Sequence, residues 1–344
     1  MIHSIKKWIA IKMVGRSKQR SLSIDQLEVK HLNTGIKSFN DSSYFAGISK
    51  EGFSFVTRQS FRNDKHNENW MMVHIPEEGV FGFENREMEE KEGFSQGELL
   101  YKCIKPGENW QLNYNGSLPQ NNNTGQLKMD LNWQSVAPIV VFDKIGTTAK
   151  QVGTQIAKEK WDSNFFKKLK ELDQVHYEQA GKLSGLFEWN GVKHNLDFVG
   201  VRDHSWGVRN WEDWDRHFWI LGLLEDGSFF NFSMISYHFV KNLQAAFIFD
   251  NGAYTTIFKI PNFDEIEMDG MMPKSLSFDV IEKENGPIKR MSLEMKHFFP
   301  FHMDNDYYLR QAKADFSYGD KKGVGIAEMG INLKTYQIDV NSTY

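Results

Sequence analysis

The chain has 344 residues, of which 40% are hydrophobic and 25% charged, which suits one large or two medium globular β-domains. Its net charge of −4 excludes the basic surface that nucleic-acid binding needs. The only cysteine, Cys103, excludes an intrachain disulfide and a thiolate metal cage. A single cysteine also fits a reducing compartment, so we expect a cytoplasmic protein. The aromatic content of 14% suits β-sheets and apolar pockets.

Residues 1–20 carry six Lys or Arg residues and no acid. Ile2, Ile5, Ile9 and Met13 fall close to one helical face, which is typical of a segment on a membrane surface or of a targeting peptide. A frayed basic tail is the alternative, and it stays open. The segment is too short and too charged to span a bilayer, and no other stretch approaches about 18 uninterrupted apolar residues. We therefore expect membrane contact or organelle targeting only through these residues.

A first β-domain is predicted over residues 21–146, because short apolar runs alternate there with Gly, Asn and Asp at hairpin spacing. The clearest run is SSYFAGISKEGFSFVTRQSFR, in which Glu51-Gly52 predicts a turn between two strands. Residues 147–180 then read as a helical connector of one or two helices. Their apolar positions recur at helical spacing among many charged residues: Val152, Ile156, Phe165, Leu169 and Leu172.

A second β-domain is predicted over residues 181–344, where a hairpin is expected at Asn285-Gly286. WILGLLEDGSFFNFS, residues 219–233, is similar in pattern to YFAGISKEGFSFVTR, residues 44–58. Each has an apolar strand, two glycines five residues apart and then aromatic residues. This similarity favours two like β-modules, built as stacked sheets or barrels.

A dense polar and aromatic motif, GVRDHSWGVRNW, occupies residues 200–211. It follows a predicted strand, so alternate side chains should face opposite ways: Val201, Asp203 and Ser205 on one face, and Arg202, His204 and Trp206 on the other. Consecutive Asp-His-Ser residues cannot form a hydrolase triad among themselves. The sequence also lacks a GxSxG elbow, an HExxH metal motif and a phosphate-binding or dinucleotide loop. We therefore expect no metal and no cofactor.

Once these chemistries are excluded, the motif still offers an acid, a base and aromatic side chains that could line a pocket. Desolvation on a partly buried strand would favour the protonated form of Asp203, which is the form that delivers a proton to an unactivated carbon–carbon double bond. His204 would position or deprotonate water. Aromatic residues of this region would stabilise the resulting cation through their π-faces if they line the same cavity: Trp206, Trp211, Trp214, Trp219 and Phe218.

The alternative is a structural motif. Arg202, Asp203 and Arg209 would then form a buried ion-pair network that pins a β-bulge, with the tryptophans as ordinary core residues. The residues alone leave both readings open.

The motif resembles the Asp-His-Ser/Asn-Trp-Gly signature of the lipocalin-like superfamily that includes carotenoid 1,2-hydratases, attachment-protein-H-like proteins and fungal Diels–Alderases. The resemblance extends over about residues 40–332. It includes DSSYFAG, ENWQLNYNG, WDSNFFKKLKELDQVHYEQAGKLSG and GVGIAEMG, which look like one uncharacterised branch of the superfamily.

The resemblance implies two consecutive lipocalin-like β-barrels or curled antiparallel sheets, joined by a short helical segment, with an apolar ligand bound without a cofactor. By position, Asp203, His204 and Trp206 match the signature. The HYEQ element is matched by His176, Tyr177, Glu178 and Gln179, and the acid of the closing strand by Glu328. Glu178 would be a second catalytic carboxyl or would pair with an arginine to dock the connector. The expected substrate-binding residues are Trp206, Trp211, Tyr177, Arg202, Arg209 and Trp219.

Two functions follow. The first is a hydratase- or cyclase-type enzyme acting on a terpenoid or polyunsaturated substrate, with Asp203, His204 and Glu178 as catalytic residues. It predicts a closed pocket that holds an unpaired carboxyl. The second is a non-catalytic carrier or sensor of a hydrophobic ligand. It predicts that Asp203 is fully paired with arginine and that the cavity is open and purely apolar. In both cases the expected partner is a small hydrophobic molecule and not a nucleic acid.

Overall fold

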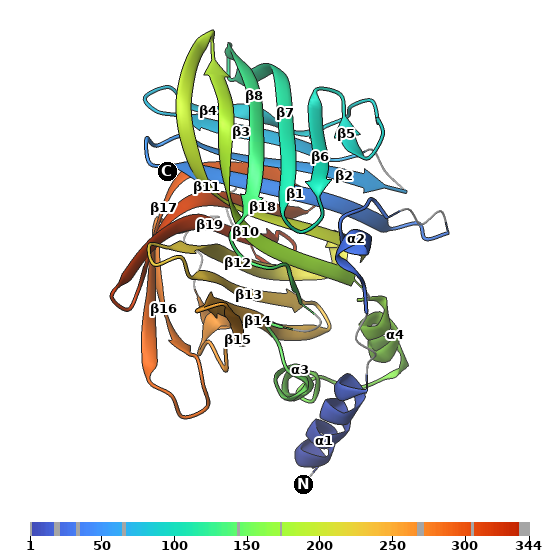
Figure 1. Ribbon diagram of the computed structural model, residues 1–344. Coiled ribbons are helices and arrows are strands. Elements are labelled where there is room, and N and C mark those ends of the chain that lie inside the picture. The colour runs from blue at the N-terminus through green and yellow to red at the C-terminus, as the bar shows by residue number, and fades with distance from the viewer. Residues whose placement is uncertain are drawn as a thin grey trace. The chain divides into compact units, whose positions relative to one another are not determined.

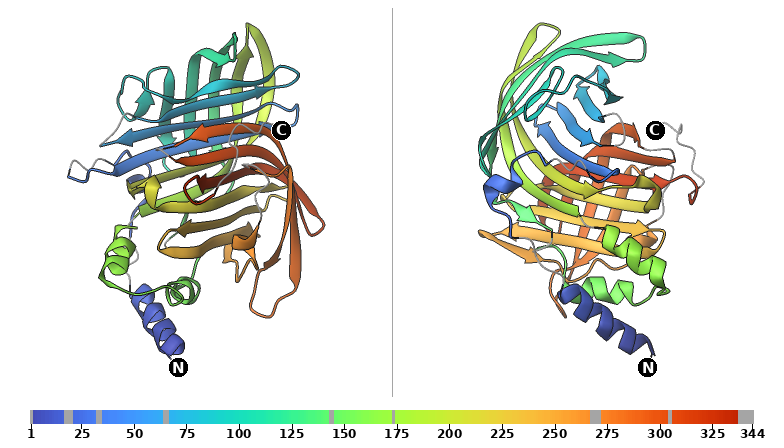
Figure 2. Two further views of the ribbon diagram at one scale, coloured as in Figure 1. Left: turned by 180° about the vertical axis from the view of Figure 1, so that it is seen from behind. Right: turned by 90° about the vertical axis from the view of Figure 1, so that its right-hand side faces the viewer.

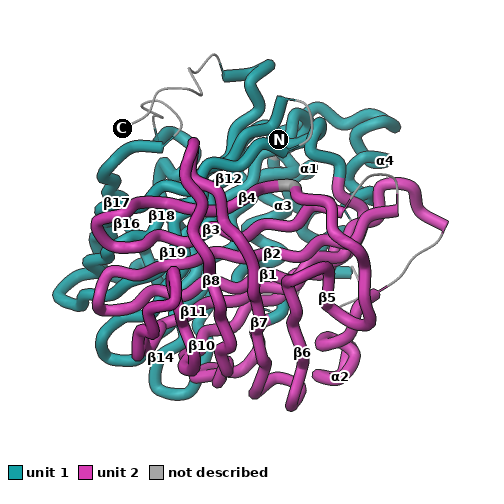
Figure 3. The backbone as a smooth tube through the Cα atoms, turned by 90° about the horizontal axis from the view of Figure 1, so that it is seen from above, with its two compact units in different colours: residues 1–20, 141–173, 210–344 teal, residues 21–140, 174–209 magenta. Residues whose placement is uncertain are grey.

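The computed structural model describes residues 2–16, 21–31, 35–63, 67–142, 145–172, 174–266, 272–303 and 306–336 (Figure 1). It divides into two compact units, coloured separately in Figure 3. Unit 1 holds residues 1–20, 141–173 and 210–344, and unit 2 holds residues 21–140 and 174–209. The predicted mostly β, lipocalin-like class is confirmed, since each unit is built around one large antiparallel sheet.

Unit 2 contains a short helix, α2 (Ile24–Leu27), and a sheet whose strands run in the order β4-β3-β2-β1-β11-β10-β8-β7-β6-β5. β1, the first of these strands along the chain, pairs with β11, the last, and the sheet curls around its core (Figure 2). Its strands are β1 (Phe39–Ser49), β2 (Ser54–Arg62), β3 (Asn69–Ile75), β4 (Gly79–Arg86), β5 (Phe94–Gln96), β6 (Leu99–Lys105), β7 (Asn109–Gln120), β8 (Asn123–Ser135), β10 (Gln174–Trp189) and β11 (Val192–Val208), and the short β9 (Val140–Val141) is attached to β10.

A row of three glycines crosses β1, β11 and β10 in register: Gly47, Gly200 and Gly181. A Cβ at Gly181 would lie 2.4 Å from the Trp133 ring, and one at Gly200 would lie 2.8 Å from it. Gly181 and Gly200 therefore make room for the fully buried Trp133 against β10 and β11, while a Cβ at Gly47 would lie 2.5 Å from the Phe55 ring.

Unit 1 contains an eight-stranded sheet in the order β15-β14-β13-β12-β19-β18-β17-β16. Here too the first strand along the chain, β12, pairs with the last, β19. Its strands are β12 (Trp214–Leu224), β13 (Phe229–Tyr237), β14 (Val240–Asp250), β15 (Ala253–Thr256), β16 (Ser275–Ile281), β17 (Ile288–His302), β18 (Tyr307–Tyr318) and β19 (Lys321–Asn332). Its helices are α1 (Ile2–Gly15), α3 (Ala149–Ile156) and α4 (Ser163–Glu171), with the 3-10 turns η1 (Trp211–Asp213) and η2 (Phe263–Glu265).

The internal repeat predicted from the two similar segments is present in the fold. Gly47 faces Phe55 across the β1–β2 hairpin, and Gly222 faces Phe230 across the β12–β13 hairpin. Each hairpin turns at a glycine with positive φ, Gly52 at 91° and Gly227 at 87°. In each unit this hairpin supplies the first strand, which pairs with the last strand of the same sheet.

The predicted helical connector is also present, as α3 and α4. Thr148 and Asp162 cap the two helices through side chains that accept from backbone N–H groups. The predicted hairpin at Asn285-Gly286 lies between β16 and β17, which pair. Among the described residues, no helix is long and apolar enough to cross a membrane.

The chain path differs from the predicted domain order. The sequence predicted that residues 147–180 form the connector and that residues 181–344 form a second domain. In the structure, β10 and β11 return to the first sheet, where β10 pairs with β8 and β11 pairs with β1. Residues 174–209, with the RDHSWG motif, therefore belong to unit 2. Pairing between strands so distant in sequence leaves no local signal, so adjacency along the chain was misleading.

Candidate active site

The motif lies on β11, and its side chains alternate between two faces as predicted. We call the face that contacts the unit 2 core the inner face, because it carries the core residues Phe45, Leu183 and Phe198. Arg202 and His204 share this face by the strand alternation, and the opposite, outer face carries Asp203. The motif therefore contributes to two separate polar networks.

Three titratable side chains on the outer face, which we call the outer-face triad, come together on β10 and β11: Glu178, His176 and Asp203. Glu178 and Asp203 face each other directly in the antiparallel register. His176 Nε2 lies 3.1 Å from Glu178 Oε1, and His176 Nδ1 lies 4.0 Å from Asp203 Oδ1. Because an ionised carboxylate only accepts hydrogen bonds, Nε2 carries the donated hydrogen. Nδ1, on the side of Asp203, is then the basic nitrogen.

The electrostatics of Asp203 suit an acid. Burial raises the pKa of Asp203 to about 6; the Glu178 carboxylate adds to this rise, and His176, Arg209 and Arg58 oppose it. The Asp203 side chain keeps 13% of its surface exposed. Among the described residues, no arginine lies within ion-pair distance of Asp203. An acid with this pKa is partly protonated near neutral pH.

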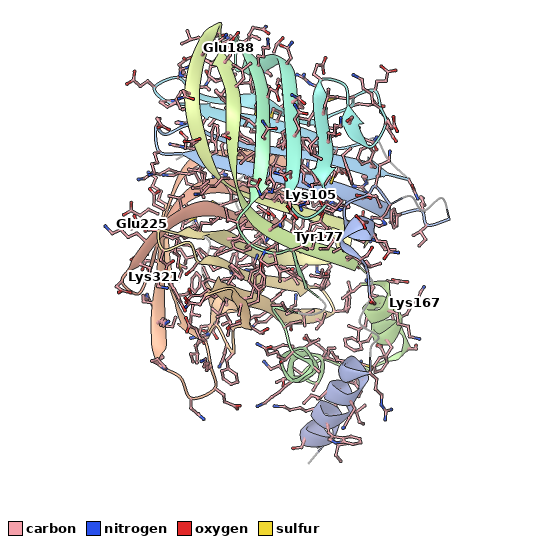
Figure 4. All side chains as sticks on the ribbon, viewed as in Figure 1. Lys105, Lys167, Tyr177, Glu188, Glu225 and Lys321 are labelled. Atoms are coloured by element: carbon pink, nitrogen blue, oxygen red, sulfur yellow. The ribbon has the colours of Figure 1, made fainter. Side chains whose placement is uncertain are left out.

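The inner-face network is centred on Arg202, whose side chain is 1% exposed. Its Nη2 lies 2.8 Å from Glu28 Oε1, and its Nε donates to Gln179 Oε1 at 2.9 Å. Tyr177, labelled in Figure 4, donates to Glu28 Oε1 at 2.7 Å, and Trp110 donates to the other oxygen of the same carboxylate. Arg202 therefore pairs with Glu28 and not with Asp203 or Glu178. Glu28 follows α2, whose capping box is formed by Ser23 and Gln26.

His204 is held by acceptors on both sides of its ring. Its Nε2 lies 2.7 Å from Asp41 Oδ1, and its Nδ1 lies 2.9 Å from the Leu27 carbonyl oxygen. Both ring nitrogens therefore face oxygens within the protein, and the side chain is 1% exposed. This geometry suits a residue that fixes the N-terminal segment on the sheet rather than one that takes a proton from water.

The other predicted substrate-binding residues are dispersed. Trp206 is half-buried and stacks on His31, with ring centroids 3.7 Å apart. Arg209 donates to Ser205 Oγ at 3.0 Å. Trp211 and Trp219 belong to unit 1, so unit 2 brings together only part of the predicted set.

A third polar network lies in unit 1, and of its members the sequence singled out only Glu328. His217 Nε2 lies 2.6 Å from Glu328 Oε1, Tyr307 hydrogen-bonds to His217 Nδ1, and Gln311 donates to the second Glu328 oxygen. Since Glu328 accepts from Nε2, Nδ1 accepts from the Tyr307 hydroxyl. Burial and then the Glu328 charge raise the pKa of Tyr307 well above its usual range, so the phenol stays protonated. Glu328 is thus a buried partner of histidine.

Removing the Tyr307 hydroxyl should destabilise the protein. Tyr307→Phe leaves His217 Nδ1 buried without its donor, which we expect to cost roughly 1–3 kcal/mol of unfolding free energy. Tyr308→Phe, one residue along β18, is the matched control, because this ring stacks on His302 and its stacking survives the change. Urea unfolding of both variants measures the difference. Equal midpoints would contradict the assigned network.

Two comparisons bear on the family and the fold. Residues 25–333 match the family model described as a domain of unknown function, DUF7064. No curated protein matches the sequence.

Solved structures with the same fold include a protein provisionally named AttH from Nitrosomonas europaea, with a TM-score of 0.55 at 11% identity. That match covers 91% of this chain and 97% of the other. Kievitone hydratase from Nectria haematococca matches with a TM-score of 0.52 at 10% identity, over 90% of this chain and 95% of that one. The predicted resemblance to the superfamily is confirmed at the level of fold.

Proposed function

The chain belongs to the DUF7064 family, and we propose that it is a cofactor-independent enzyme that protonates a carbon–carbon double bond of a hydrophobic, terpenoid or polyunsaturated substrate. The observation that carries the proposal is the outer-face triad. Asp203 combines a raised pKa with a histidine whose basic nitrogen faces it. This is the separation of acid and base roles that proton-transfer enzymes need.

The geometry supports hydration through a sequence of proton transfers that returns the site to its starting state. Asp203 gives its proton to one alkene carbon, which leaves positive charge on the other. The oxygen of a water molecule bonds to that second carbon while a water proton passes to His176 Nδ1. His176 then returns this proton to the Asp203 carboxylate, so the site is restored and the net change is addition of water. Glu178 acts as a positioning residue, because it fixes the histidine tautomer.

The fold and the composition support this class of substrate. Kievitone hydratase has the same fold, and an aromatic content of 14% suits cation stabilisation by π-faces. The catalytic assignment differs from the sequence prediction in two residues. His176 on the outer face takes the role that was expected of His204, and Glu178, which was expected to be catalytic, positions His176.

The carrier function is the alternative, and it required Asp203 to be paired with arginine. The described residues contain no such ion pair. Arg202 is engaged by Glu28, and Arg209 donates to Ser205. The proton-transfer function therefore accounts for the environment of Asp203 better than a structural ion pair in a carrier does.

The test begins with native mass spectrometry of protein purified from a eukaryotic host, followed by organic extraction. We expect a terpenoid or polyunsaturated molecule to be retained. That molecule, or a panel of terpenoid and polyunsaturated alkenes, is then incubated with the protein in water labelled with heavy oxygen. The proposal predicts a product that has gained one labelled water. Retention of the ligand by wild-type protein with no product over the whole panel would favour the carrier instead.

Variants of the positioning residue refine the same assay. Glu178→Gln keeps an oxygen near His176 but removes the negative charge, so the pH profile of hydration should shift while the ligand is still retained. A variant that changes stability alone, with an unaltered pH profile, would show that Glu178 is only structural.

A further inference from the structure

Helix α1 presents one uncovered apolar face. Ile5 is 53% exposed, Trp8 63% and Ile9 41%. Positions i, i+3 and i+4 share one side of a helix, so these side chains form a continuous patch. Among the described residues, ten large hydrophobic side chains are exposed, and three of them fall within residues 5–9. Isolated exposed apolar residues need no explanation, but a contiguous patch of this kind marks an interaction site.

The opposite side of α1 is fixed to unit 1. Ala10 is fully buried, and Ile11 packs so closely on α3 that a Cβ at Gly153 would lie 2.7 Å from its backbone nitrogen. Lys6 donates to the Glu159 carbonyl oxygen and lies 4.9 Å over the Trp161 ring. Figure 1 shows α1 beside α3. The helix therefore cannot turn its apolar face inward without breaking these contacts.

The charge along the same face selects the kind of partner. Lys12 and Arg16 follow Ile9 at helical spacing and are exposed, so they continue the line that begins at Ile5 and Trp8. We call these five residues the α1 stripe. Residues 1–20 contain six basic and no acidic side chains, in a chain whose net charge is −4. An apolar patch that includes tryptophan and is flanked by cations fits a surface that is apolar inside and anionic outside.

We propose that the α1 stripe docks the protein on an anionic lipid membrane. Ile5, Trp8 and Ile9 would enter the boundary between headgroups and acyl chains, and Lys12 and Arg16 would contact lipid phosphates. The helix has 14 residues, so it lies in the interface and does not span. The inference goes beyond the proposed catalysis and does not depend on it, since the stripe lies wholly in α1 and the residue that follows it.

The test is flotation of the full chain with two kinds of vesicle, phosphatidylcholine alone and phosphatidylcholine with phosphatidylserine. We expect binding to the anionic vesicles that weakens at high salt. The variant Trp8→Ser/Ile9→Ser should bind at least roughly tenfold more weakly, because two large apolar side chains no longer enter the membrane. Lys12→Ser/Arg16→Ser should lose most of the preference for anionic vesicles.

The matched controls are Ile288→Ser, which removes an apolar side chain that is 64% exposed on β17, and Lys102→Ser, which removes an exposed cation on β6. Both should bind like the wild type, and circular dichroism should show that every variant is folded. Three outcomes would overturn the proposal: no binding of the wild type to anionic vesicles, binding that the stripe variants do not change, or a concentration-dependent dimer that Trp8→Ser/Ile9→Ser dissociates while vesicle binding is absent.

Discussion

Replacing Asp203 with asparagine will abolish turnover and at the same time stabilise the folded protein at neutral pH. The gain in stability follows from burial. The pKa of Asp203 is raised from 3.8 to about 6, so ionising this carboxyl costs the folded state roughly 3 kcal/mol relative to the unfolded chain. Asparagine has nearly the same shape and does not ionise, so it avoids this cost. The catalytic acid therefore lowers the stability of the folded protein at neutral pH.

The pH dependence identifies the cause. Below pH 3.8 the carboxyl is protonated in both states, so the variant and the wild type should be equally stable. As the pH rises towards about 6, the unfolded chain ionises first, and the advantage of Asp203→Asn should grow and then level off. Urea unfolding at a series of pH values measures the difference.

A matched control lies on the same strand. Asp197 is exposed on β11, and Asp197→Asn should change neither turnover nor the pH dependence of stability. If Asp203 served only a structural ion-pair network, Asp203→Asn would be less stable than the wild type at neutral pH. That result would remove the basis for assigning Asp203 as the acid.

Breaking the Glu28–Arg202 ion pair should have the largest effect on stability. Both side chains are 1% exposed. Arg202→Met leaves the Glu28 carboxylate buried without its cation, a change that costs roughly 3–5 kcal/mol. Arg290→Met is the control, since its pair with Asp279 is exposed and should contribute about 1 kcal/mol or less. Thermal and urea unfolding of the two variants make the comparison.

Acid should reduce this difference. Burial raises the pKa of Glu28, but the Arg202 charge and the hydrogen bonds from Arg202, Tyr177 and Trp110 outweigh it, so the pKa lies below 4.5. The pair therefore stabilises the fold above pH 4.5, and this stabilisation is lost as the pH falls through the lowered pKa. The double variant Glu28→Gln/Arg202→Met should recover part of the loss. Equal costs for Arg202→Met and Arg290→Met would contradict the buried network.

Local sequence signals predicted the local structure well. Glu51-Gly52 and Asn285-Gly286 mark real hairpins, because turn geometry depends on residues that are adjacent in the chain. The alternation along β11 also placed Asp203 and His204 on opposite faces, since side-chain direction in a strand repeats every two residues.

Long-range pairing could not be predicted in the same way. Glu28 and Asp41 complete the inner-face network from 174 and 163 residues away, and no local pattern marks them. His176 was identified as part of the HYEQ element, but its role as a base was not predicted, for another reason. It lies two residues from Glu178 on a strand, which is the spacing that puts both side chains on one face, and this signal was present in the sequence.

The most direct test of the account is the titration of Asp203 itself. An infrared difference spectrum between acid and neutral pH detects a protonated carboxyl, and subtracting the spectrum of Asp203→Asn assigns its signal. We predict a midpoint near pH 6 that is lost in Asp203→Asn and unchanged in Asp197→Asn. A carboxyl that titrates near pH 4 would contradict the account, because the protonated fraction of Asp203 at neutral pH would then be roughly a hundredfold smaller and burial would not have prepared it as a proton donor.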